Sequence, residues 1–254
     1  RPSAMTHHTP EERRDRQSAR ARALIPGGCH TYAKGDDQYP VSAPGFIARG
    51  KGCHVWDLDG REYIEYGMGL RAVTLGHAFE PVVAAAMEQL PLGSNFTRPA
   101  PVEVECAERL LSLIDAADQV KFAKDGSTVV TASLRLARAF TGRDRVVHCR
   151  DHPFFSYNDW FIGSYAMSAG IPRQHRELVS TFRYNDLESL AGLFVRYPGE
   201  IACVVMEPER DLPPEEGFLQ GVRELTREHG ALLVFDEMIR SEERRVGKEC
   251  VSEC

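Results

Sequence analysis

The stretch Gly230-Ala231-Leu232-Leu233-Val234-Phe235-Asp236-Glu237 decides the fold class of this chain. Its centre is apolar throughout, which is typical of a strand covered on both faces, and the two acids mark the strand's end. Similar apolar runs occupy 145–149, 178–182 and 201–206, and helical patterns occupy 187–197 and 218–229. Buried strands that alternate with helices predict an α/β fold, with a mainly parallel sheet and helices on both faces.

Upstream of these strands, apolar residues recur at helical spacing in 82–90, 104–114 and 127–140. A short strand is predicted at 120–123, just before the last of these helices. Earlier still, 53–57 and 62–66 flank Asp59-Gly60, which is the pattern of a β-hairpin. Thr9, Pro10 and Glu12 predict the start of an N-terminal helix through a capping box.

These patterns predict three parts of the chain. Residues 1–76 form an N-terminal helix and a small antiparallel unit, and 77–239 form part of a large α/β domain. Residues 240–254 are dense in charge and have no apolar face. We interpret this last segment as a foreign or disordered tail, and a solvated helix is the alternative.

Composition excludes several classes of protein. The 254 residues are 43% hydrophobic with a formal net charge of −6, which argues against disorder and against a nucleic-acid-binding surface. No apolar run approaches the roughly 18 residues of a spanning helix, so we expect no membrane role. The seven cysteines are scattered without a CxxC pair. We expect a cytoplasmic protein in which Cys29, Cys53, Cys106, Cys149 and Cys203 are reduced, small core residues.

The turn Lys124-Asp125-Gly126-Ser127-Thr128 carries the first chemical signal, because it joins the predicted strand at 120–123 to a helix. Gly126 lets the backbone approach an anion, Ser127 offers a hydroxyl, and the helix N-terminus presents open N–H groups. The pattern indicates a phosphate cradle. The same residues also begin ordinary helices, so this signal alone leaves both interpretations open.

The second signal is Asp236, which directly follows a buried strand. A carboxylate in that place is costly unless it meets a partner, and the protonated ring nitrogen of pyridoxal phosphate (PLP) is one suitable partner. A helix cap or a surface acid is the alternative. Between the two signals, the aromatic run in 154–161 either packs in the core or stacks on a flat cofactor. We expect Gly126 and Asp236 to lie on the same side of the sheet.

Taken together, these motifs and their order resemble one family, the class III (fold type I) PLP enzymes, and within it the glutamate-1-semialdehyde 2,1-aminomutase-like proteins. The resemblance spans roughly Leu24 to Ile239. It rests, in chain order, on Ile25-Pro26-Gly27-Gly28, Trp56-Asp57-Leu58-Asp59-Gly60, Leu75-Gly76-His77, Gly126-Ser127, Leu134-Arg135-Leu136-Ala137-Arg138, Thr141-Gly142-Arg143-Asp144, Met206-Glu207-Pro208 and the stretch at 230–237.

The resemblance implies a role for each matching residue. Gly126 and Ser127 would hold the PLP phosphate, and Asp236 would pair with the pyridine nitrogen. Phe154 would stack on one ring face, where a tyrosine is usual, and Met238 would pack on the other, where valine or isoleucine is usual. Phe155 falls where histidine is frequent, and Glu207 would buttress the site. It further implies amino and keto or aldehyde substrates and a homodimer of the full-length protein.

Three departures lie at or near the substrate side. The usual Ser-Gly-Thr-Glu run is Asp125-Gly126-Ser127-Thr128 here, and His30 to Lys34 replace Asn-Ser-Pro-Val-Arg. Leu70, which is followed by Arg71, replaces the tryptophan expected before Leu-Gly-His. They leave PLP binding intact and put the aminomutase reaction in doubt.

The family's Schiff-base lysine lies about thirty residues beyond the Asp-Glu pair, so it is absent from this chain, and we assign no catalytic residue and no metal. We therefore expect the N-terminal portion of a PLP-dependent aminotransferase or aminomutase. The alternative is a catalytically inactive binding or structural module with the same fold. The sequence has neither a P-loop nor a GxGxxG after a strand, which disfavours an unrelated nucleotide-binding protein.

Overall fold

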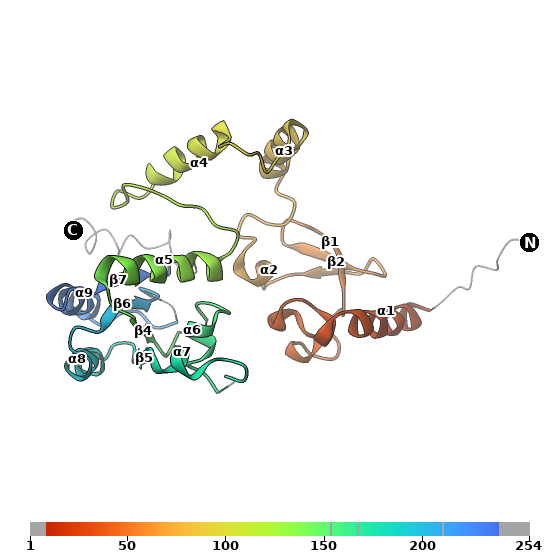
Figure 1. Ribbon diagram of the computed structural model, residues 1–254. Coiled ribbons are helices and arrows are strands. Elements are labelled where there is room, and N and C mark those ends of the chain that lie inside the picture. Colours follow the sequence, from red (N-terminus) through yellow and green to blue (C-terminus); the bar gives the residue numbers. More distant parts are fainter. Residues whose placement is uncertain (1–8, 153, 167, 210, 239–254) are drawn as a thin grey trace, which may run out of the picture. The chain divides into compact units, whose positions relative to one another are not determined.

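A computed structural model describes residues 9–152, 154–166, 168–209 and 211–238. The chain divides into two units, which span 1–98 (unit 1) and 99–254 (unit 2). Figure 1 shows the elements of each unit along the chain.

Unit 1 contains a three-stranded antiparallel sheet in the order β1-β2-β3. Its strands are β1 (Ile47–Lys51), β2 (His54–Asp57) and β3 (Glu62–Ile64); its helices are α1 (Pro10–Leu24), α2 (Met68–Arg71) and α3 (Glu80–Gln89), with short 3-10 turns at Pro26–Gly28, Tyr32–Lys34, Asp36–Gln38 and Leu90–Leu92. The predicted hairpin is confirmed as β2 and β3. The sequence did not indicate β1, which pairs with β2 through an irregular register.

The start of α1 is the predicted capping box. The Glu12 N–H donates to Thr9 Oγ1 at 3.2 Å, and the Thr9 N–H donates to the Glu12 carboxylate at 2.8 Å. Two of the donors that a helix N-terminus leaves open are satisfied in this way.

Unit 2 is built on a four-stranded sheet in the order β5-β4-β6-β7, in which every neighbouring pair is parallel. Its elements are α4 (Pro101–Leu111), α5 (Gly126–Thr141), β4 (Arg145–Cys149), α6 (Asp159–Ile162), α7 (Arg173–Glu177), β5 (Val179–Phe182), α8 (Leu187–Arg196), β6 (Ile201–Met206), α9 (Phe218–Glu228) and β7 (Leu232–Phe235). The predicted α/β fold with a parallel sheet is therefore confirmed.

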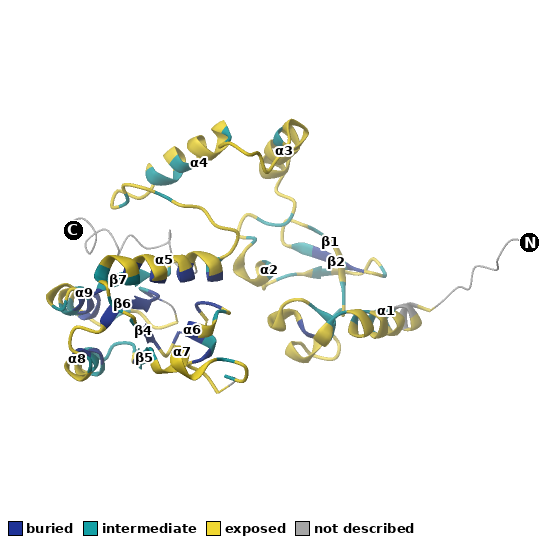
Figure 2. Ribbon diagram, in the orientation of Figure 1, coloured by how far each residue is buried: buried dark blue, intermediate teal, exposed yellow. Residues whose placement is uncertain are grey.

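Helices cover both faces of this sheet. On one face, α8 and α9 pack through residues such as Leu190 and Val222 against Val147 and Val204. On the other face, Leu134 of α5 and Phe161 of α6 pack against Val146, Cys203 and Val205. Figure 2 shows that burial concentrates in these strands, and all six residues of β6 are buried. The carboxyl ends of the strands are thus held by a core on either side.

Two expectations are corrected. Residues 120–123 form no strand, because a strand requires hydrogen bonds to a neighbour and none of the described strands pairs with this segment. Of the five cysteines expected in the core, Cys149 and Cys203 are buried, whereas Cys53 and Cys106 are exposed and Cys29 is partly exposed. Burial raises the pKa of both buried thiols to about 12.

Within the part of the chain that the structure describes, none of the helices combines the length and the apolar character that crossing a bilayer requires. The predicted tail at 240–254, and Lys248 within it, lie outside the described residues.

Candidate functional site

The sheet of unit 2 has a point where its strand order reverses, between β4 and β6. The chain passes from β4 outward to β5, then returns past β4 to place β6 and β7 on the other side. Ligands of open α/β sheets bind beyond the carboxyl ends of the strands at such a point. The segments after β4, β6 and β7 contain the predicted residues Phe154, Glu207 and Asp236.

The N-terminus of α5 supplies the predicted cradle. Gly126 is the first residue of this helix and Ser127 the second, and among the described residues neither backbone N–H donates a hydrogen bond. The buried Ser127 hydroxyl accepts the Tyr157 N–H at 3.2 Å. Its own hydrogen finds no acceptor in the described part of the chain. Two N–H groups and one O–H are therefore available to an anion at the positive end of the helix dipole.

Asp125 caps the same helix. Its carboxylate accepts the Thr128 N–H at 2.8 Å and the Thr128 hydroxyl at 3.0 Å. Both bonds hold the carboxylate on the third residue of the helix and leave Gly126 and Ser127 open. The Asp125 carboxylate nevertheless places a negative charge beside the anion site, and this charge repels a bound anion.

The end of β7 meets this helix start. A Cβ added to Gly126 would collide with Cε at the end of the Met238 side chain, so the two residues are close neighbours. The Met238 N–H donates to Asp236 Oδ1 at 3.1 Å, and the Asp236 N–H donates to the carbonyl oxygen of Met206 at 2.9 Å. The structure therefore brings Gly126, Asp236 and Met238 to one edge of the sheet, as expected.

The carboxyls after β7 are costly to ionise. Burial raises the pKa of Asp236, and the hydrogen bond from the Met238 N–H offsets this only in part. Burial and the neighbouring Asp236 charge raise the pKa of Glu237. A cation bound beside Asp236 would favour its ionised form and reverse the effect of burial.

The two phenylalanines after β4 have different surroundings. Phe155 is buried and its ring meets Phe161 edge-on at 5.6 Å, so it belongs to the core. Phe154 is 56% exposed, and its ring meets Phe161 at 5.7 Å in a T-shaped arrangement. Phe154 thus has one side fixed by Phe161 and offers a surface for stacking.

Sequence reasoning missed two residues at this edge, the buried His152 and the partly buried Tyr184. His152 follows β4, and its Nδ1 accepts the Glu207 N–H at 3.0 Å, which ties the end of β4 to the end of β6. Tyr184 follows β5, and its hydroxyl donates to the carbonyl oxygen of Pro208 at 2.7 Å. Burial raises the pKa of Tyr184, and the charges of Glu209 and Glu207 add to this. Their position directly after apolar strands was the signal that would have identified them.

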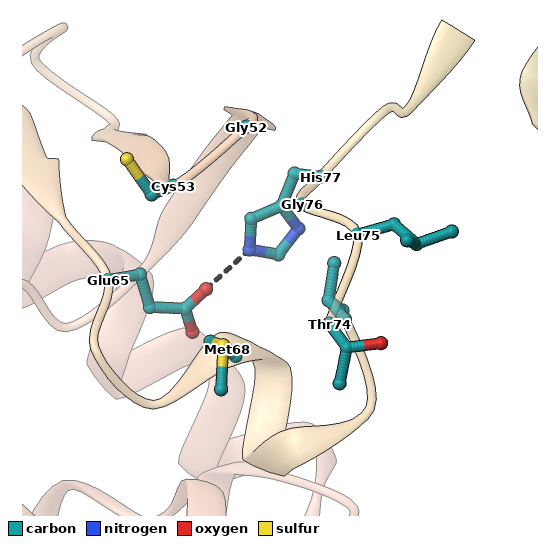
Figure 3. Close-up of a pocket in the computed structure, with 9 residues that line it drawn as sticks. Gly52, Cys53, Glu65, Met68, Thr74, Leu75, Gly76 and His77 are labelled. Atoms are coloured by element: carbon teal, nitrogen blue, oxygen red, sulfur yellow. Dashed lines mark hydrogen bonds and ion pairs between the residues drawn. The ribbon is translucent and has the colours of Figure 1, made fainter. Parts of the chain in front are cut away.

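Unit 1 has a cavity of its own, of about 200 Å³, between Gly52, Glu65 and His77 (Figure 3). The Glu65 carboxylate contacts His77 Nε2 and accepts the Gly69 N–H at 3.2 Å. Met68, Leu70 and Arg71 have φ values of 44°, 61° and 69°, a left-handed turn that L-residues rarely adopt. Strained backbone of this kind is common near functional sites, and Leu70 and Arg71 are a departure noted in the sequence.

Comparisons with known proteins agree with these features. The family model "Aminotransferase class-III" matches residues 32–241. A glutamate-1-semialdehyde 2,1-aminomutase of Syntrophomonas wolfei is 36% identical over 236 residues, which cover 87% of this chain and 54% of that protein.

Two solved structures share the fold. The PLP internal aldimine form of the FumI protein of Sphingopyxis sp. MTA144 is 31% identical with a TM-score of 0.81, covering 89% of this chain and 55% of that one. An omega-transaminase from Sphaerobacter thermophilus is 28% identical with a TM-score of 0.81, covering 91% and 56%.

The chain spans about half the length of the curated relatives it matches. The family model covers most of both units. This chain belongs to the class-III aminotransferase family.

Proposed function

We propose that the whole protein transfers amino groups with PLP, as an aminotransferase or a glutamate-1-semialdehyde 2,1-aminomutase-like enzyme. This chain contributes the residues for the cofactor's phosphate and pyridine ring. When bound, PLP supplies an electron sink for the substrate's reacting carbon. The observation that carries the proposal is the meeting of the open N-terminus of α5 with Asp236 and Met238 at one edge of the sheet.

The available groups fit the cofactor in charge and shape. The N–H groups of Gly126 and Ser127 and the Ser127 hydroxyl match a phosphate's oxygens. Asp236 is the carboxyl whose raised pKa a pyridinium would lower, and in return its charge keeps the ring nitrogen protonated. Phe154 and Met238 provide apolar surfaces for the ring faces, and Glu207 supports the site from the end of β6.

Amino compounds and keto or aldehyde compounds are the proposed substrates, and a homodimer is the proposed assembly of the whole protein. The changes at Leu70, Arg71 and Asp125 favour aminotransferase chemistry over the aminomutase reaction. A catalytically inactive binding or structural module with the same fold is the second candidate.

The test is PLP binding by this chain at low micromolar concentration, with pyridoxal as the probe that lacks a phosphate. Ser127→Ala should weaken PLP about tenfold and leave pyridoxal unchanged, because it removes one charge-assisted hydrogen bond. Asp236→Asn should weaken both ligands. Ser133→Ala is the matched control, since the Ser133 hydroxyl donates within α5 to the carbonyl of Val130. Equal affinities of wild type and Ser127→Ala for PLP would contradict the proposal.

Asp125→Asn tests the effect of the negative charge that Asp125 places beside the phosphate cradle. Asparagine is an equally good cap, so the helix start is kept while a negative charge beside the phosphate is removed. We expect PLP affinity to rise about tenfold at low salt, and the gain to shrink as salt screens the charges.

Treatment of the PLP mixture with borohydride should leave no covalently attached cofactor on this chain. A reduced adduct that disappears in Lys248→Ala would show instead that the chain carries its own reactive lysine.

A further inference from the structure

A buried set of hydroxyls joins the aromatic loop after β4 to helix α5. Thr131 lies on the second turn of α5, and its Oγ1 accepts the Asn158 Nδ2–H and the Trp160 Nε1–H, both at 2.9 Å. Ser156 Oγ lies 3.2 Å from the same atom. The Asn158 Nδ2–H group also lies 3.0 Å from Ser156 Oγ, so Thr131, Ser156 and Asn158 form one connected hydrogen-bonded set.

The hydrogen bonds continue from Ser156 to the cradle. Ser156 Oγ accepts the Asn158 N–H at 3.1 Å and lies 3.4 Å from the carbonyl oxygen of Ser127, to which it donates. The Tyr157 N–H then donates to Ser127 Oγ. This last bond makes the Ser127 hydroxyl an acceptor for the protein, so that its hydrogen is left for a ligand.

These bonds place two ligand-binding elements relative to each other. The cradle is on α5, which is anchored to the sheet through Val130 and Leu134. The stacking candidate Phe154 is on the loop and is more than half exposed. Among the described residues its ring contacts Phe161 edge-on, and this contact does not fix the distance between the Phe154 ring and the cradle. The hydrogen bonds at Thr131, Ser156 and Asn158 therefore fix the position of this loop relative to α5.

We propose that Thr131 is a positioning residue of the cofactor site: its hydroxyl sets the distance between the ring-stacking loop and the phosphate cradle. This inference rests on the proposed PLP function. A ligand that spans both elements needs them in fixed register, whereas a free phosphate needs only the helix N-terminus. The two ligands therefore separate a positioning role from a general effect on folding.

Three variants test the inference. Thr131→Val has nearly the same shape but removes the acceptor of two buried N–H donors. Thr131→Ser keeps the hydroxyl. Thr226→Val is the matched control, because Thr226 is also a buried helical threonine, and its hydroxyl donates to the carbonyl of Arg223 in α9, on the opposite face of the sheet.

The measurements are the dissociation constant of PLP, the inhibition of PLP binding by inorganic phosphate, and hydrogen exchange of the Tyr157 and Asn158 amides in the ligand-free chain. For Thr131→Val we expect PLP to bind about tenfold more weakly. The two amides should exchange faster, because the loop that carries them has lost the hydrogen bonds that join Asn158 and Trp160 to α5. The affinity for inorganic phosphate should stay the same. Thr131→Ser should restore the wild-type values, and Thr226→Val should match wild type.

The remaining outcomes contradict either the positioning role of Thr131 or the proposed PLP function. Equal losses of PLP and phosphate affinity in Thr131→Val, or the same losses in Thr226→Val, would overturn the positioning role. Unchanged exchange at Tyr157 and Asn158 would also overturn it. If the wild-type chain binds no PLP, the proposed function of this chain fails, while faster exchange in Thr131→Val alone would still show that Thr131 sets the loop.

Discussion

The two units differ in how far their apolar side chains are covered. In unit 2, strands β4 and β6 and the inner faces of α5, α8 and α9 form a buried core on both sides of the sheet. Among the described residues of unit 1, Val55 is the single hydrophobic side chain that is buried. Met87 and Leu90, at the end of α3 and just beyond it, are 66% and 69% exposed. Local signals therefore suffice to start a helix, whereas burial requires a partner surface.

The same contrast separates two aspartates that end strands. Asp57 ends β2, and its carboxylate accepts the N–H groups of Asp59 and Arg61 and the Tyr63 hydroxyl. Burial opposes its ionisation, but these hydrogen bonds and the Arg61 charge outweigh burial and lower its pKa. Asp236 follows β7 and has a raised pKa. Hydrogen bonds that outweigh burial, as at Asp57, are typical of a structural turn, whereas a carboxyl whose pKa is raised by burial, as at Asp236, is typical of a functional site.

The largest expected effect concerns the cores. Leu134→Ala should lower the free energy of unfolding of unit 2 by about 2–5 kcal/mol, because Leu134 is 1% exposed and its loss leaves a cavity. Leu90→Ala in unit 1 should change stability by less than about 0.5 kcal/mol. Urea denaturation followed by circular dichroism measures both. A large loss of unfolding free energy in Leu90→Ala would contradict this contrast between the units, because it would mean that another surface covers Leu90 in solution.

The second-largest expected effect concerns self-association of the chain. Uncovered apolar faces in unit 1 should make the chain associate as its concentration rises. Met87→Glu should weaken this association about tenfold or more, since each buried side chain of this size contributes about 1.5–3 kcal/mol. Light scattering across a dilution series is the measurement. Val195→Glu is the control, because Val195 is an exposed residue of α8 in unit 2. Equal effects of the two changes would show that unit 1 is not the associating surface.

The smallest effect concerns pH, and its sign differs between the two aspartates. The lowered pKa of Asp57 gives stability that is present above its unfolded pKa and is lost as pH falls through the folded value. The raised pKa of Asp236 gives stability that is present at low pH and is lost as pH rises through the folded value. At neutral pH, Asp57→Asn should therefore weaken the β2–β3 turn by about 1 kcal/mol, whereas Asp236→Asn should stabilise unit 2.

Hydrogen exchange of the Asp59 and Arg61 amides reports on the first change, and thermal unfolding of unit 2 as a function of pH reports on the second. The gain from Asp236→Asn should disappear at acid pH, where both proteins carry a neutral side chain. A gain that persists there would assign it to packing and not to charge.

The outcomes of particular predictions show how far the sequence reaches. The sequence predicted the bounds of β4 and β6 without error. In β6 the apolar pattern is unbroken, as expected of a strand buried on both faces, and in β4 it is interrupted by Arg145 and His148. The capping box of α1 and the hairpin turn were also predicted, since both depend on residues a few positions apart. The roles of Gly126, Ser127, Phe154, Glu207, Asp236 and Met238 as cofactor ligands stay predictions, which the binding experiments test.

The failed expectations all depend on distant neighbours. Residues 120–123 have strand-like composition, but a strand forms only where another strand offers its hydrogen-bonding edge. Cys53 and Cys106 have apolar or mixed neighbours in sequence, yet none of the elements that the structure describes buries them. The sequence also gave no sign that Thr131 would meet Ser156 and Asn158.

Local sequence thus determined the four strands of the parallel sheet to within a residue, the cap of α1 and the hairpin turn, and which residues follow those strands. The tertiary structure alone decided which faces are covered, which carboxylates are satisfied and which hydroxyls meet. The physical reason is range. Caps, turns and periodicity act within about one or two turns of chain, whereas burial and hydrogen bonding between elements depend on segments far apart in sequence, such as Thr131 and Asn158.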